Sequence, residues 1–218
     1  MSKPYTASDF SNQIIEDRTW RIKEISDLKS AVERADTILQ KVLLRSIVAI
    51  CYAHWEGSVK YSARKYMEHI CLRRYKVGDL DRQFIRNLFL PRLAQLSKSN
   101  ASVSQRCEFI DQLLDSSDKR FTRIDEDLVN TKSNLNYDVF LDICLVCGLP
   151  SDGWAKLSTF IDVILLKRRN EIAHGENTFI DISDLDEITN NTVALMRSFG
   201  DALDNQASLE KYKSISVL

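Results

Sequence analysis

Helix-breaking residues are scarce in this chain, and their scarcity limits the folds open to it more than any other feature. The 218 residues include six glycines and three prolines, and the stretch from Ala35 to Tyr75 has no proline. Leu, Ile, Lys, Glu and Arg occur throughout the sequence. Because this composition suits long helices better than the many turns of a β architecture, we predict an all-α fold.

Apolar residues at helical spacing predict the individual helices, and they lie within a single domain over residues 1–218. The predicted helices cover about residues 11–34, 35–75, 84–96, 107–114, 137–147, 153–174 and 185–203. Residues 1–12 are expected to be a loose lead-in, 205–218 a loose tail and 116–130 an exposed segment. Pro91 should interrupt the helix at 84–96. Asn134 and Asn136 should cap the helix at 137–147.

A short polar motif ends the apolar run that begins at Phe160. It contains Arg169, Asn170 and His174, and Gly175 follows as a helix stop. A histidine titrates near neutral pH and can move protons, while an arginine stays cationic and can hold a phosphate with its planar fork. Metal-free cleavage of RNA needs this combination of groups.

The spacing of the motif leaves its geometry open. Asn170 and His174 lie four residues apart and share a helix face, whereas Arg169 lies about 140° round the helix from His174. Either the long side chain of Arg169 bridges this angle, or a second copy of the motif completes the site across a two-fold dimer axis.

Three stretches together resemble the HEPN superfamily of all-α domains. Arg169, Asn170 and His174 match its motif of an arginine, a polar residue, three variable residues and a histidine. The stretches 51–60 and 132–137 resemble signatures of the prokaryotic MAE-type branch. The resemblance covers roughly residues 40 to 200 and implies a helical-bundle dimer with the motif at its cleft. The sequence pattern itself adds a long second helix and extra helices in the middle third, where we expect the structure to vary most from any relative.

The resemblance also implies a function, namely a metal-independent endoribonuclease of a bacterial toxin-antitoxin or phage-defence system. The expected partners are RNA, a second copy of the chain and a cognate antitoxin or defence protein. The alternative is a non-catalytic HEPN-like module that binds a nucleotide or a protein. The formal net charge of −1 favours this alternative, since it gives no global signal for nucleic acid.

Local basic clusters can still contact RNA, although most such clusters are solvated faces. Three occur in the sequence, at Arg64–Lys65, Arg73–Lys76 and Lys167–Arg169. The candidate RNA contacts chosen from them are Arg73, Arg74, Lys167 and Arg168. Glu56 is either an exposed glutamate or, as the resemblance implies, a supporting residue that orients Arg169 or His174.

The remaining titratable residues predict no cofactor and no metal site. His54 and His69 are the alternative histidines, and His54 is interpreted as a hydrogen-bonded or surface residue. No two histidines have the helical spacing of metal ligands. Cys144 and Cys147 have the spacing of half a zinc or redox site but lie in an apolar run, which favours packing. Five cysteines, with no signal peptide and no apolar run long enough for a bilayer, predict a cytoplasmic protein and no membrane partner.

Overall fold

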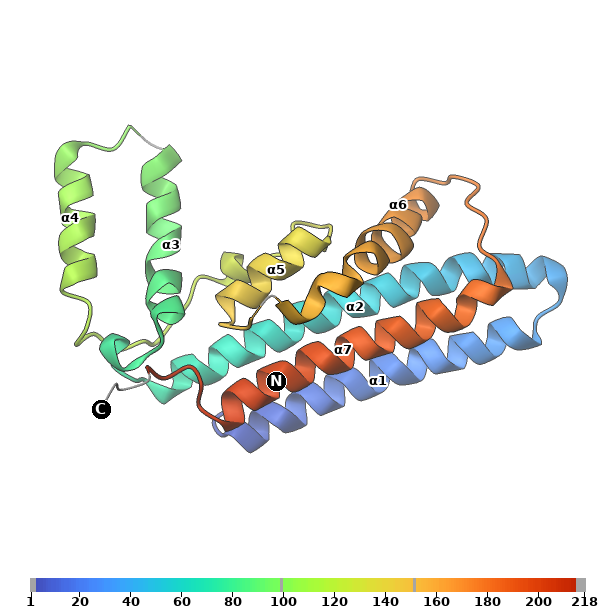
Figure 1. Ribbon diagram of the computed structural model, residues 1–218, viewed down its shortest axis with the longest axis horizontal. Helices are drawn as coiled ribbons and strands as arrows, with labels where there is room; N and C mark the ends of the chain where they lie inside the picture. The colour runs from blue at the N-terminus through green and yellow to red at the C-terminus, as the bar shows by residue number, and fades with distance from the viewer. Residues whose placement is uncertain (1–2, 99, 151, 215–218) are drawn as a thin grey trace.

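Three long helices lie side by side and form the main body of the protein. The computed structural model describes residues 3–98, 100–150 and 152–214. In this part of the chain α1 (Ala7–Arg34), α2 (Thr37–Arg73) and α7 (Leu185–Ser208) pack against one another (Figure 1). The described residues form helices and no strand, so the predicted all-α fold is confirmed. None of these helices has the length and apolar character that a bilayer-spanning helix needs.

Helix α2 is the longest element, as its freedom from proline predicts. It runs for 37 residues, a length of about 55 Å at about 1.5 Å per residue. The Asp36 side chain caps its start by accepting hydrogen bonds from the backbone N–H groups of Ile38 and Leu39. Arg74, in a left-handed conformation, ends it. Helices α1, α7 and α6 (Arg168–Ala173) all pack along α2.

An aromatic cluster ties the shorter elements to the long helices. Phe140 of α5 (Tyr137–Val146) lies 5.0 Å from Trp55 of α2 and 5.5 Å from Phe199 of α7, between ring centroids. Trp154, in a 3₁₀ helix over Asp152–Leu157, lies 5.2 Å from the same ring. Phe140, Trp55 and Phe199 are buried. Burial of each ring stabilises the fold by about 2–3 kcal/mol.

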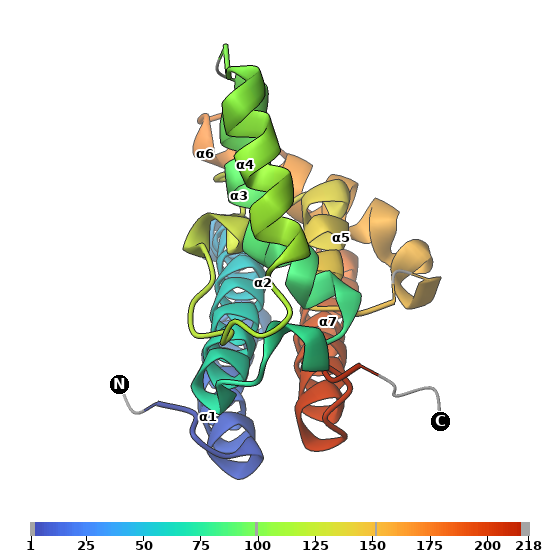
Figure 2. The same ribbon diagram turned by 90° about the vertical axis from the view of Figure 1, so that its left-hand side faces the viewer.

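A helical hairpin, α3 (Arg82–Lys98) and α4 (Val103–Leu114), projects from the main body (Figures 1 and 2). No residue of α4 is buried. The predicted interruption of α3 at Pro91 is wrong, since the helix continues through this residue. A proline removes one backbone hydrogen bond, and here the turns on both sides keep the helix intact.

Both chain ends are more ordered than the predicted lead-in and tail. Helix α1 starts at Ala7, because Thr6 and Asp9 form a reciprocal capping box with two hydrogen bonds of 2.9 Å. At the other end α7 continues to Ser208, and Tyr212 beyond it is buried. The loose lead-in is therefore wrong for residues 7–12 and the loose tail for 205–212. Residues 1–2 and 215–218 lie outside the described part.

The segment between α4 and α5 runs across α2 (Figure 2). It includes a 3₁₀ helix over Glu126–Val129. Most of residues 116–130 are exposed as predicted, but Phe121 and Val129 are buried. These two apolar side chains fix the segment to the core.

The paired cysteines and two of the histidines belong to the interior. Cys144 and Cys147 are fully buried, and burial raises the pKa of Cys144 to about 12, so their interpretation as packing residues is confirmed. His54 Nε2 lies 2.9 Å from a Glu24 oxygen, and His69 Nδ1 donates to the Pro4 carbonyl oxygen at 2.9 Å. Burial lowers the pKa of both rings, which supports a structural role for each.

These buried histidines should make the protein less stable at mildly acid pH. Because the folded-state pKa of His69 is lowered, the unfolded chain takes up the proton first, and stability present above about pH 6.5 is lost as the pH falls. The urea midpoint should therefore drop between about pH 7.5 and pH 5.5, and His69→Gln should reduce that drop. The exposed His174→Gln is the control. An equal drop in both variants would contradict this account.

Candidate active site at the end of the motif helix

The helix that carries the motif is not a regular α-helix. Residues Phe160–Lys167 are π-helical, and α6 (Arg168–Ala173) follows directly. Within the π segment Phe160 and Leu165, five residues apart, are both buried. A π-helical turn contains more residues than an α-helical turn, so it suits buried side chains that are five residues apart. Such segments occur frequently at functional sites, and here the segment sets the rotation at which α6 leaves the core.

The motif helix ends at the predicted residue. His174 is its C-cap, and Gly175 has a φ of 80°. The Gly175 N–H donates to the Ile172 carbonyl at 3.1 Å, and the Glu176 N–H donates to the Glu171 carbonyl at 2.9 Å. This is the full Schellman pattern, which requires a left-handed residue after the cap. The stop predicted from Gly175 is confirmed.

Arg169 is held from two sides by side chains that lie far away in the sequence. Its guanidinium carbon lies 4.0 Å above the ring of Tyr52 on α2. Its Nη2 donates to Asn134 Oδ1 at 3.1 Å and to the Ser133 carbonyl at 3.4 Å. Its buried Nε has no partner among the described residues, and the structure describes no acceptor for Nη1. The side chain is thus oriented, while part of its hydrogen-bonding capacity is left for a ligand.

Tyr52 also supports the loop that meets Arg169. Its hydroxyl accepts a hydrogen bond of 2.6 Å from the backbone N–H of Leu135. Burial raises the pKa of Tyr52 above its ordinary value, so the hydroxyl stays neutral and the ring face stays available to the cation. One tyrosine of α2 therefore positions both the arginine and the loop residue beside it.

The loop itself has an unusual backbone. Lys132 and Ser133 have φ values of 52° and 64°, a left-handed conformation that costs about 1–2 kcal/mol for a residue with a side chain. The backbone N–H of Lys132 donates to Asn130 Oδ1 at 2.8 Å, and that of Asn134 donates to the Thr131 carbonyl at 3.0 Å. Strain of this kind persists where the surroundings over-determine the chain. Its effect here is to present Asn134 to Arg169.

Asn134 lies in the candidate site, although the sequence predicts a capping role for it. It was predicted to cap α5 together with Asn136, but only Asn136 does so, accepting from the Val139 N–H at 2.8 Å. The side chain of Asn134 instead accepts from Arg169. The signal that pointed to it was its place in the stretch 132–137.

His174 and Asn170 lie on the outer side of the helix end. His174 is exposed and Asn170 is half-buried, and the His174 N–H donates to the Asn170 carbonyl at 2.9 Å. Arg169, in contrast, is drawn toward α2. The arginine and the histidine of one chain therefore diverge, in keeping with their angular separation of about 140°. The histidine is open to solvent or to a second molecule.

Glu56 stands one turn beyond Tyr52 on α2 and contacts a different part of the loop. Thr131 donates a hydrogen bond from its hydroxyl to Glu56 Oε1. The described bond thus joins Glu56 to the loop beside Asn134 rather than to Arg169 or His174. A role in supporting the site through the loop remains a prediction.

The four basic residues predicted to contact RNA are divided between the two ends of α2. Arg168 pairs with Asp184 at 2.9 Å, and Lys167 lies 4.0 Å from Glu171 beside the motif. Arg73 and Arg74 lie about 30 Å from Tyr52, given 21 helical residues at about 1.5 Å each. The structure brings Lys167 and Arg168 to the motif and leaves Arg73 and Arg74 at the far end.

An arginine that the sequence did not single out holds the loop after the motif. Arg45 Nη1 donates to the Glu176 carbonyl at 2.7 Å and to the Thr178 carbonyl at 3.2 Å. The Thr178 hydroxyl donates to Glu171 Oε2 at 3.0 Å. These bonds fix the chain after His174 against the first turns of α2. In the described part of the chain, no three His, Cys, Asp or Glu residues cluster as metal ligands.

A family model described as RiboL-PSP-HEPN matches residues 16–205. No curated protein matches the chain, and no solved structure does so either. The matched range includes α2, the loop around Asn134 and the whole motif helix.

Replacing the glycine that ends the motif helix should cost stability. Gly175→Ala places a side chain at a φ of 80°, and we expect a loss of about 1 kcal/mol in the free energy of unfolding. Gly153→Ala is the matched control, since a Cβ at either position meets no atom within 4 Å and Gly153 does not have a positive φ. Chemical denaturation of both variants measures the difference. Equal stabilities would show that the strain assigned to Gly175 is absent.

Proposed function

Because the chain belongs to the RiboL-PSP-HEPN family, we propose that it is a metal-independent endoribonuclease whose chemistry is carried by Arg169, Asn170 and His174. The observation that supports this most is the fixed position of Arg169 on Tyr52 and Asn134, with Nη1 left open. An oriented arginine suits a phosphate, because its fork matches two phosphoryl oxygens. The exposed histidine at the same helix end supplies an imidazole, which can act as a general acid or base.

The proposed reaction is attack of the RNA 2′-oxygen on the adjacent phosphorus. A bond forms between the 2′-oxygen and phosphorus while the bond from phosphorus to the 5′-oxygen breaks. His174 takes the 2′-hydroxyl proton or delivers a proton to the leaving 5′-oxygen, and solvent water serves as the partner for the other transfer. Arg169 neutralises the charge that grows on the phosphoryl oxygens, and Asn170 holds the phosphate or the imidazole ring.

A second copy of the chain would complete the site. The histidine and arginine of one chain diverge, and exposed apolar side chains surround this end of the bundle. Ile38 and Val42 on the first turns of α2, and Phe179 after the motif, are 82%, 57% and 72% exposed. Clustered exposed apolar surface marks interaction sites. In a two-fold dimer through this end, the Arg169 of one chain would face the partner's histidine.

The biological role proposed with this activity is that of a toxin or an antiviral nuclease in the bacterial cytoplasm. Such an enzyme requires restraint, so a cognate antitoxin or defence protein is the expected partner. The support for this role is the resemblance to the superfamily.

A non-catalytic HEPN-like binding module is the second candidate. The net charge of −1 favours it, because it gives the chain no general attraction to nucleic acid. Such a module would keep Arg169, Asn170 and His174 as an interface. It would bind a nucleotide or protein without cutting RNA, which separates it from the enzyme.

Cleavage of RNA should depend on His174 and on the substrate 2′-hydroxyl. Purified protein should cut single-stranded RNA in excess chelator, and His174→Ala should lower the rate by roughly 10²- to 10⁴-fold. The neighbouring exposed Glu176→Ala is the control and should cut normally. A substrate with a 2′-deoxy nucleotide at the cleavage position should resist. Cutting of that substrate, or equal activity of both variants, would rule out the proposed mechanism.

Two inactive variants should restore activity when mixed if the site is shared between chains. Each mixed dimer of Arg169→Ala and His174→Ala retains one intact arginine–histidine pair when the pair spans the two-fold axis. With free exchange of subunits we expect about a quarter of the normal rate. An inactive mixture, after mixed dimers are verified by mass spectrometry, would place both residues of each site in one chain.

A further inference from the structure

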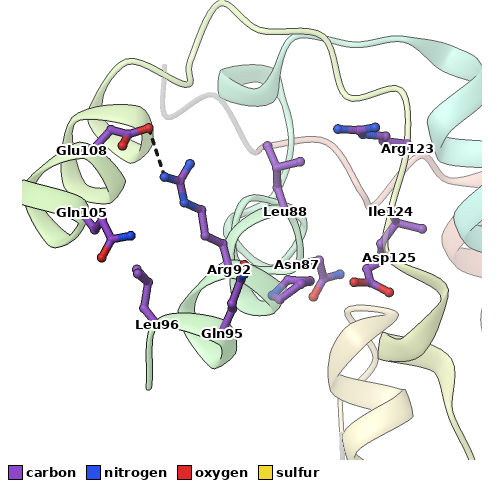
Figure 3. A pocket seen from close by; sticks show the side chains of 11 residues that line it. Asn87, Leu88, Arg92, Gln95, Leu96, Gln105, Glu108, Arg123, Ile124 and Asp125 are labelled. Atoms are coloured by element: carbon purple, nitrogen blue, oxygen red, sulfur yellow. Dashed lines mark hydrogen bonds and ion pairs between the residues drawn. The ribbon is translucent and has the colours of Figure 1, made fainter. Parts of the chain in front are cut away.

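Two pockets lie on either side of residues 123–125, and they differ in their free charge. The larger, about 820 Å³, lies between α3, α4 and this segment (Figure 3). Its Arg92 is already paired, with Nη2 3.1 Å from Glu108 Oε1. Arg123 borders both pockets. The cationic side chains of the second pocket are less engaged in ion pairs, so this pocket is the better candidate for an anionic ligand.

This second pocket is a groove of about 730 Å³ between α2 and the segment 122–129. We call it the α2 groove. Its lining includes Lys60, Tyr61, Arg64 and Arg123, together with the carboxylates of Glu68, Asp125 and Glu126. In the described chain Lys60 and Arg123 have no ion-pair partner, and Arg64 lies 3.7 Å from its nearest carboxylate, that of the exposed Glu126. Three cationic side chains are therefore available to a ligand in the groove.

A paired arginine is built rigidly into the groove wall. Arg21 donates from Nε and Nη2 to the two oxygens of Asp17 at 2.8 and 2.9 Å. Its Nη1 has no acceptor described and reaches α2 at Gly57, where a Cβ would lie only 2.5 Å away. Gly57 thus leaves room for the guanidinium. Because Asp17 neutralises its charge, Arg21 shapes the groove wall and is not one of the available cations.

The segment that lines the α2 groove leads along the chain to the candidate active site. On α2, Glu56 and Lys60 lie about 40° and 80° round the helix from Tyr52, so the path turns gradually from the site into the groove. Lys60 is about 12 Å along the axis from Tyr52. The groove wall is the same segment that, a few residues later, binds Glu56 through Thr131 and Arg169 through Asn134.

We infer that the α2 groove holds the single-stranded RNA that extends from the scissile phosphate, with phosphates on Lys60, Arg64 and Arg123 and a base stacked on Tyr61. This inference rests on the proposed ribonuclease function. A charged groove that includes an aromatic ring is the usual device for binding single strands without reading their sequence. The aromatic ring and the segment that leads to the site favour RNA over an acidic protein segment.

The test is the salt dependence of RNA binding. Affinity of a fluorescent single-stranded oligonucleotide is measured by anisotropy in the His174→Ala background, which prevents cleavage. Lys60→Glu with Arg123→Glu should remove two phosphate contacts, lowering the slope of log K against log salt by about 1.4 and the affinity by about tenfold or more near 0.1 M salt. The matched control reverses two exposed charges outside the groove, Arg82→Glu with Lys211→Glu.

The possible outcomes distinguish failure of the groove proposal from failure of the proposed ribonuclease function. A slope and affinity equal to those of the control would overturn the groove, even if His174-dependent cleavage stands. Groove-dependent binding without cleavage by the wild type would keep the groove and reject the ribonuclease. Poly-L-glutamate that binds as tightly through the same two residues would overturn the assignment to RNA. Lys60→Gln with Arg123→Gln, which avoids charge reversal, should still lower the slope if the reversed variant fails to fold.

Discussion

The stack of Arg169 on Tyr52 connects the motif helix to the bundle and decides where the site's cation lies. A cation over an aromatic ring is worth about 0.5–2 kcal/mol, which is small beside the burial of the core. The stack matters because it fixes the position of the guanidinium, to which Asn134 also hydrogen-bonds. These two contacts hold the arginine away from the His174 of its own chain. The constraint explains both the open Nη1 and the proposed need for a second chain.

Helix α2 is the frame on which each functional feature is placed. Arg45 near its start holds the loop after the motif, Tyr52 holds Arg169, and Glu56 binds the strained loop. One turn further on, Lys60 enters the α2 groove. Residues on a single buried helix keep fixed spacings, and fixed spacing is what a site needs to hold a substrate in register.

Sequence patterns predicted the features that depend on local chemistry. The length of α2, the buried stripe of α7 and the stop at Gly175 follow from breakers and helical spacing. Features that depend on distant contacts were missed. Asn134 lies just before a helix, where an asparagine is expected to cap the backbone. Only the fold shows that it binds Arg169. The apolar stripe of α4 looks like a core face, yet Ile110 and Leu114 are exposed. A local pattern does not show whether another element covers that face.

The chemical identity of the RNA ends tests the central claim most directly. If Arg169 and His174 direct attack by the 2′-oxygen, the 5′ fragment must end in a 2′,3′-cyclic phosphate and the 3′ fragment must begin with a free 5′-hydroxyl. Mass spectrometry of both fragments from a short defined substrate distinguishes these ends. A 5′-phosphate on the 3′ fragment, paired with a 3′-hydroxyl on the other, would mean that water is the nucleophile. That result would contradict the roles given to Arg169 and His174.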